Sequence, residues 1–210
     1  LDVVGFVLAQ GSFEIVKRTV DVDVNGDGFI DPATTPSSPD LKDASIMVVR
    51  LEGVDLFVGV GGAFNGDKTE IDTSQAIGFS VAGADLELAM IKPEAVTPAP
   101  AVPSQESYLG LEMTISSAGL VGLEDVPVIF DATNLLVQVN KGTDATGAAQ
   151  RLDWSTTFAG NADQTDLPTF TMPSSLELKA SGTVALDVVG FVLAQGSFEI
   201  VKRTVDVDVN

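Results

Sequence analysis

The sequence predicts an all-β chain, arranged as an elongated β-solenoid-like or stacked-sheet repeat or, as the alternative, as a β-sandwich. Four observations predict this class. Apolar and polar residues alternate along most of the chain, which gives a strand one buried and one solvated face. Glycine recurs inside the strand-like runs, and a segment of 25 residues occurs twice. A capped run with 3.6-residue spacing over three turns, which would indicate an amphipathic helix, is not found.

The strand-like runs share a period of two and a high content of Val, Ile and Phe, which pleated surfaces favour. In the clearest run, Leu109, Leu111 and Met113 alternate with Gly110 and Glu112. The runs lie, in order, at residues 54–60, 77–81, 86–90, 109–115, 126–130 and 176–180.

Four glycines interrupt these runs, namely Gly53, Gly83, Gly119 and Gly182. Glycine inside a strand indicates a tight bend, a bulge or a close backbone approach. Both the stacked coils of a solenoid and the Greek-key turns of a sandwich would produce this recurrence. An elongated stack is favoured because the next repeat can cover an otherwise open sheet edge.

The repeated segment LDVVGFVLAQGSFEIVKRTVDVDVN begins at Leu1 and ends at Asn25, and it recurs from Leu186 to Asn210. We therefore expect residues 1–185 to be one β-rich repeat period and residues 186–210 to be the start of the next, cut from a longer repetitive protein. The alternative is an added terminal strand that fills a sheet edge. A proline-rich stretch at residues 92–107 is expected to be an exposed excursion from the sheet.

Composition limits the function classes. The formal net charge of −19 opposes binding to nucleic acid and favours cations as partners. No apolar run approaches the length that a membrane-spanning helix needs, so no membrane insertion is expected. The chain has no His and no Cys, and it holds neither a nucleophile elbow nor a phosphate-binding loop. We therefore expect no enzymatic activity, and the single Trp and single Tyr supply a stacking surface for carbohydrate only poorly.

The stretch DVDVNGDGFID has the residue spacing of a calcium-binding loop. Oxygen-bearing side chains recur at alternate positions, a glycine permits the sharp turn, a backbone carbonyl serves at position 7, and a branched apolar residue at position 8 fixes the loop to a core. The predicted calcium ligands are Asp23, Asn25, Asp27, the Phe29 carbonyl and Asp31.

Position 12 of this loop departs from the pattern, because Thr34 stands where a bidentate acidic residue is expected. Asp40 and Asp43 from the following loop, or Asp21 before the motif, are the candidate replacements. The alternative interpretation is a solvated turn rich in Asp, Asn and Gly that binds no ion.

The pattern DxNxDGxID resembles the calcium loops of dockerins and of thrombospondin type 3 repeats, which implies a calcium site that needs no flanking helices. At the scale of the whole period, the run from GSFEIVKRTVDVDVNGDG to LLVQVNK resembles the tandem repeats of very large secreted or surface-attached, adhesin-like bacterial proteins. This second resemblance implies an extracellular or cell-surface structural element that assembles with copies of itself. A carbohydrate- or ligand-binding adhesion module remains the alternative.

Overall fold

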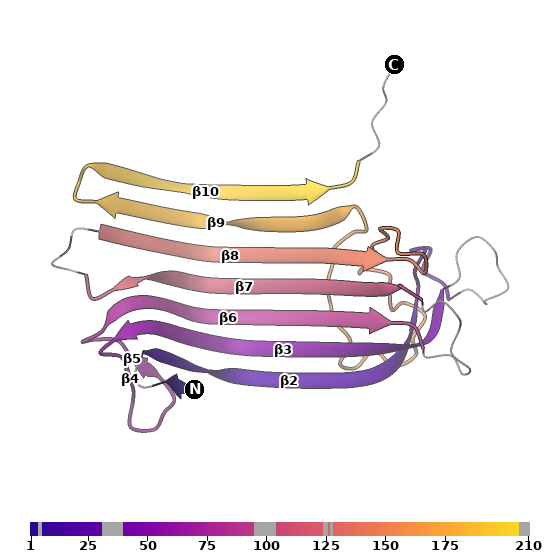
Figure 1. Cartoon of the computed structure of the whole chain (residues 1–210), viewed down its shortest axis with the longest axis horizontal. Coiled ribbons are helices and arrows are strands. Elements are labelled where there is room, and N and C mark those ends of the chain that lie inside the picture. The colour runs from indigo at the N-terminus through magenta and orange to yellow at the C-terminus, as the bar shows by residue number, and fades with distance from the viewer. Residues whose placement is uncertain (4–5, 31–39, 95–103, 124–125, 127, 206–210) are drawn as a thin grey trace, which may run out of the picture.

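The computed structural model describes residues 1–3, 6–30, 40–94, 104–123, 126 and 128–205, and these residues form strands and turns without a helix (Figure 1). The predicted all-β fold class is confirmed. The strands are β1 (Asp2–Val3), β2 (Val7–Val22), β3 (Leu41–Val60), β4 (Ala63–Phe64), β5 (Ile71–Asp72), β6 (Ile77–Lys92), β7 (Ser107–Val121), β8 (Val128–Thr143), β9 (Leu176–Val188) and β10 (Val192–Arg203).

The main sheet has the order β1-β2-β3-β6-β7-β8-β9-β10, and every neighbouring pair is antiparallel. Each long strand therefore pairs with the next long strand along the chain, and β4 and β5 form a separate hairpin between β3 and β6. Of the predicted arrangements, the stacked sheet describes this best, because the strands form an antiparallel meander rather than the parallel coils of a solenoid.

Two of the four predicted glycines, Gly53 and Gly83, lie at a bulge inside the strands rather than at strand ends. Gly53 and Gly83 have φ angles of 57° and 59°, which glycine adopts without steric cost. The amide of Gly53 donates to Asp85 Oδ1 at 2.8 Å, and the amide of Gly83 donates to Asp55 Oδ1 at 2.9 Å. The pairing of β3 with β6 shifts register at this position. The predicted runs 77–81 and 86–90 are consequently halves of one strand, β6.

Residues 144–175, which we call the covering segment, connect β8 to β9 without regular structure and pack on one end of the sheet. Trp154 lies at the centre of this core, with the Phe170 ring 5.1 Å away edge-on and the Phe158 ring 6.2 Å away. The buried core residues are Val20, Val22, Val24, Ala44, Ile46, Val48, Ala89, Ile91, Tyr108, Leu152, Trp154, Phe158, Leu167, Phe170, Met172 and Leu176.

A buried amide fixes the covering segment to the sheet. Asn140 on β8 is fully buried, and its Nδ2 donates to the carbonyls of Leu152 and Pro173 at 2.9 and 3.2 Å. Its Oδ1 accepts a hydrogen bond from Trp154 Nε1 at 3.0 Å. Both the amide nitrogen and the amide oxygen of Asn140 therefore have hydrogen-bond partners, as buried polar groups generally do.

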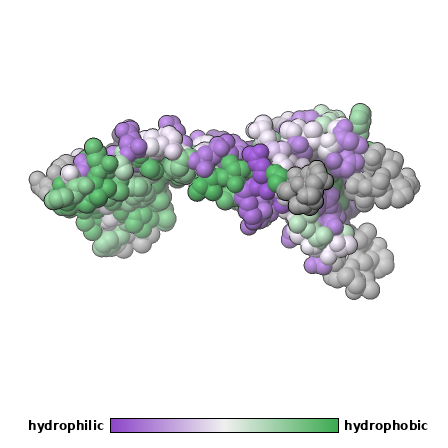
Figure 2. All heavy atoms as spheres, turned by 90° about the horizontal axis from the view of Figure 1, so that it is seen from above, coloured by the Kyte–Doolittle hydropathy of each residue, from purple (hydrophilic) through white to green (hydrophobic). Residues whose placement is uncertain are grey.

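A smaller core lies at the opposite end of the sheet, where Leu8, Phe57 and Ala76 are buried against Phe64 and Ile71 from the β4–β5 hairpin. The molecule is therefore thicker at its two ends than between them, as the view from above shows (Figure 2). Hydrophobic side chains gather on the surface at this second end (Figure 2).

Candidate calcium loop and repeat junction

The predicted calcium loop follows β2 directly, and its first acidic residue is buried. Asp23 has a relative exposure of 1%. Its Oδ1 accepts the amide of Gly26 at 2.6 Å and its Oδ2 accepts the amide of Gly28 at 2.7 Å. Both glycines have positive φ angles, which the tight turn needs. One carboxylate therefore holds the loop closed.

The next two predicted ligands lie in the same turn and are exposed. Asn25 Oδ1 accepts the amide of Asp27 at 2.8 Å, and Asp27 Oδ1 accepts the amide of Phe29 at 2.9 Å. The Phe29 side chain is 71% exposed, so its part in the predicted site would be limited to the backbone carbonyl. The structure thus brings Asp23, Asn25 and Asp27 together in one loop.

The candidate replacement ligands also lie near this loop. Asp40 is buried, and its Oδ1 accepts the amide of Val24 at 2.9 Å. Asp21 Oδ1 accepts the amide of Asp43 at 3.0 Å. Asp31, the predicted ligand at position 9, lies outside the residues that the structure describes. Among the described residues no three Asp or Glu side chains gather closely enough to hold a metal, so calcium remains a prediction.

Residues far away in the sequence position the loop. The Asp23 amide donates to the Thr157 carbonyl at 3.0 Å. Asn161 brackets Asp21, accepting its amide at 3.0 Å and donating to its carbonyl at 2.7 Å. Ile30, predicted to fix the loop to the core, packs so closely against Gly160 that a Cβ on residue 160 would overlap the Ile30 side chain. The covering segment is therefore part of the loop's scaffold, which local spacing did not reveal.

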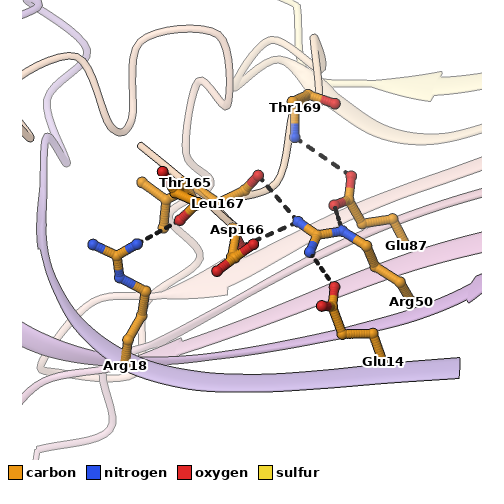
Figure 3. A network of polar contacts seen from close by, with 8 residues as sticks. All are labelled: Glu14, Arg18, Arg50, Glu87, Thr165, Asp166, Leu167 and Thr169. Atoms are coloured by element: carbon orange, nitrogen blue, oxygen red, sulfur yellow. Dashed lines mark hydrogen bonds and ion pairs between the residues drawn. The ribbon is translucent and has the colours of Figure 1, made fainter. Parts of the chain in front are cut away.

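A polar network joins the covering segment to β2, β3 and β6 (Figure 3). Arg50 on β3 pairs with Glu14 and Glu87, each at 2.8 Å. Its Nη2 also donates to the carbonyls of Asp166 and Leu167 at 3.1 and 3.2 Å. Arg18 on β2 donates to the Thr165 carbonyl nearby. These guanidinium groups connect the covering segment to the strands through fixed, multiple hydrogen bonds.

Replacing Arg50 with methionine should lower the free energy of unfolding by about 1–3 kcal/mol, because two carboxylates and two loop carbonyls lose their shared donor. Denaturant titration followed by Trp154 fluorescence measures the change. Lys17→Met is the matched control, since Lys17 is exposed on the neighbouring strand and should change stability by less than about 0.5 kcal/mol. Equal losses in the two variants would contradict this account.

The two copies of the repeated segment form the same hairpin at the two edges of the sheet. At the first copy Asp2 pairs with Leu8 and Val3 with Val7. At the second copy the equivalent residues pair identically, Asp187 with Leu193 and Val188 with Val192. β10 is thus the second copy of β2, and it continues the sheet from β9. Leu186 lies within β9, whereas Asn210 lies outside the described residues.

Oppositely charged side chains pair between β10 and β9. Lys202 Nζ lies 2.5 Å from Glu177 Oε1, and Lys179 Nζ lies 3.0 Å from Glu199 Oε2. The hydrogen bond from Lys202 holds the pKa of Glu177 below its ordinary value. Along the same pairing, the hydroxyls of Thr183 and Ser197 lie 3.0 Å apart.

No family model, no curated protein and no solved structure matches the chain. Within the residues that the structure describes, no helix is long and apolar enough to cross a membrane.

Proposed function

We propose that the chain is a structural repeat unit of an extracellular bacterial filament or giant surface protein, in which one sheet continues from unit to unit and calcium stiffens each junction. The observation that carries this proposal is the pairing of β10. The second copy of the repeated segment extends the sheet with the register that the first copy has at the opposite edge. A sheet whose last strand repeats its first can be extended by whole periods.

The different burial of the two copies supports continuation of the sheet. Leu8 is 1% exposed because Phe57 and the β4–β5 hairpin cover it, whereas the equivalent Leu193 is 83% exposed. A further period would place a second β3 beside β10 and cover Leu193 in the same way. Burying one such side chain contributes about 1.5–3 kcal/mol. Continuation also pairs backbone groups that an open sheet edge leaves exposed.

Calcium enters the proposal through the position of the acidic loop. The loop follows directly from β2, the strand that stands at the junction, and it contacts the covering segment of its own period. A divalent ion on Asp23, Asn25 and Asp27 would reduce the repulsion within a chain of net charge −19. The ion would also hold the end of β2 in place, and β2 is the strand that would pair with the neighbouring unit.

Carbohydrate binding is less well supported. Trp154 and Tyr108 are the only Trp and Tyr in the chain, and both are buried, with exposures of 3% and 2%. Neither ring is presented to solvent as a stacking surface.

The test uses a chain with two periods, in which residues 1–185 occur twice before residues 186–210. One period contributes the six strands β2, β3, β6, β7, β8 and β9, so the sheet should lengthen by six strand spacings, about 29 Å. Small-angle X-ray scattering of the 210-residue chain and of the two-period chain, each with calcium and with EDTA, measures this. Two globules joined by a flexible connection would contradict the continuous sheet, and identical curves with and without EDTA would contradict the calcium.

A further inference from the structure

The edge of β9 that β10 covers has a second possible occupant. Residues 7–18 of β2 have the same sequence as residues 192–203 of β10. A β2 strand that paired with β9 would therefore place the same side chains beside it as β10 does. β10 is a peripheral strand, because among its residues Val201 alone packs against the main core and the others are exposed. Removing β10 from β9 therefore leaves the rest of the core in place.

Within the part of the chain that the structure describes, the outer edge of β2 pairs with another strand only near its start. β1 pairs with β2 only at Val7 and Leu8, and Leu1 adds hydrogen bonds to Ala9. Among the described residues no strand pairs with that edge beyond Ala9. A β9 strand from another copy would replace residues 1–3 with residues 186–188, which have the same sequence and make the same pairs.

The charged side chains of β9 are complementary to those of β2 in the same way as to those of β10. Lys17 is the counterpart of Lys202, which pairs with Glu177, and Glu14 is the counterpart of Glu199, which pairs with Lys179. Glu14 already pairs with Arg50 of its own copy. On docking, this carboxylate would lie between that arginine and a lysine of the other copy, which would extend a ladder of opposite charges across the junction.

We propose that the outer edge of β9 is a strand-acceptor site whose occupant, once β10 is released, is β2 of a second copy of this chain. In the intact chain the acceptor is filled from within, because the turn at residues 189–191 holds β10 at an effective concentration in the millimolar range. Exchange of β10 for an identical strand gains no new contacts, so the intact chain stays monomeric below that concentration. This inference extends the proposed function to assembly between separate chains and rests on it for the continuity of the sheet.

The test releases β10 by the double substitution Phe198→Pro with Glu199→Pro. The N–H groups of consecutive strand residues point to opposite sides, so one of the two prolines removes a hydrogen bond to β9. Light scattering after size exclusion should show chains of two or more copies that grow with concentration, while the unsubstituted chain remains monomeric. A peptide of residues 191–204 should return the variant to monomers, and a peptide of the same composition in reversed order should not.

Disulfide trapping tests the register, because the chain has no cysteine of its own. Ser12 is the counterpart of Ser197, whose partner is Thr183. In the proline background, one sample carrying Ser12→Cys and another carrying Thr183→Cys should form a crosslinked dimer on oxidation. The pair Ser12→Cys with Glu177→Cys, which lies off this register, should form at least tenfold less.

A milder variant covers the case in which the prolines unfold the chain. Glu199→Lys with Lys202→Glu replaces both attractive pairs on β9 by repulsive ones and leaves every backbone hydrogen bond available. The same crosslink between copies should increase by about threefold or more over the unsubstituted β10. Adding Glu177→Lys and Lys179→Glu restores complementarity to β10 and should return the crosslink to its original level.

Two results would overturn the inference. One is a β10-released variant that keeps the circular dichroism of the sheet and yet stays monomeric at about 1 mM. The other is crosslinking that favours the off-register pair. Either result would leave the proposed function standing if the two-period chain still lengthened by about 29 Å, so the two failures are distinguishable.

Discussion

Replacing Trp154 with alanine should lower the free energy of unfolding by about 3–5 kcal/mol, the largest effect expected of any single side chain. The indole fills the space between the covering segment and the sheet, and its ring contacts Phe158 and Phe170. Its truncation also leaves Asn140 Oδ1 without the Nε1 donor in a fully buried position. The covering segment forms no strand of its own, so its order depends on side-chain contacts such as those of the buried Trp154.

Denaturant unfolding followed by far-ultraviolet circular dichroism measures this effect, since the variant lacks the fluorophore. Phe13→Ala is the matched control, because Phe13 is an aromatic residue of the sheet that is 76% exposed and should change stability by less than about 0.5 kcal/mol. A loss below 1 kcal/mol for Trp154→Ala would mean that the covering segment is not held by this core. Proteolysis should in addition cut the variant first within residues 144–175.

The strands could be predicted from the sequence because their signal is local. Side chains alternate in runs such as residues 109–115 and 176–180, and these runs lie inside β7 and β9. Strand lengths were harder to predict, since Gly53 and Gly83 suggest ends as readily as bulges. The carboxylates of Asp85 and Asp55 accept the two glycine amides, and that long-range pairing is what lets the strands continue.

The covering segment could not be predicted from periodicity. Its aromatic residues Trp154, Phe158 and Phe170 are separated by gaps of four and twelve residues and do not form a sustained apolar repeat, because an irregular segment places side chains by turns rather than by a repeating backbone. Its clearest signal was compositional, since the single tryptophan of an otherwise aromatic-poor chain lies there. The polar anchors Asn140, Thr157 and Asn161 had no sequence signal, as each acts through backbone groups far away in the chain.

The residues within the candidate loop could be predicted, whereas the residues of the covering segment that hold the loop in place could not. Spacing alone identified Asp23, Asn25 and Asp27 as members of one turn, and the structure shows them in one turn. From the repeat we predict that residues 186–210 begin a second period. The partners of β10 beyond the repeated hairpin, such as Glu177 and Lys179, could not be predicted, because they lie outside the repeated segment.

Asp23→Ala should lower the free energy of unfolding by about 2–4 kcal/mol even without calcium, because the amides of Gly26 and Gly28 lose a charged acceptor beside a buried position. If the loop binds calcium, the ion stabilises the unsubstituted chain by about 2.7 kcal/mol at a concentration one hundred times its Kd. The variant should lose that increment as well, so its melting temperature should be the same in calcium and in EDTA.

Asp67→Ala is the matched control, since Asp67 is an exposed aspartate in the turn between β4 and β5. It should keep both the stability and the calcium response of the unsubstituted chain. Calorimetry of the three proteins in calcium and in EDTA separates the two contributions, because loop closure by Asp23 acts in both buffers and ion binding acts in one. If the melting temperature of the unsubstituted chain does not change with calcium, the prediction of calcium binding at this loop is contradicted. The Asp23 carboxylate alone would then account for the order of the loop.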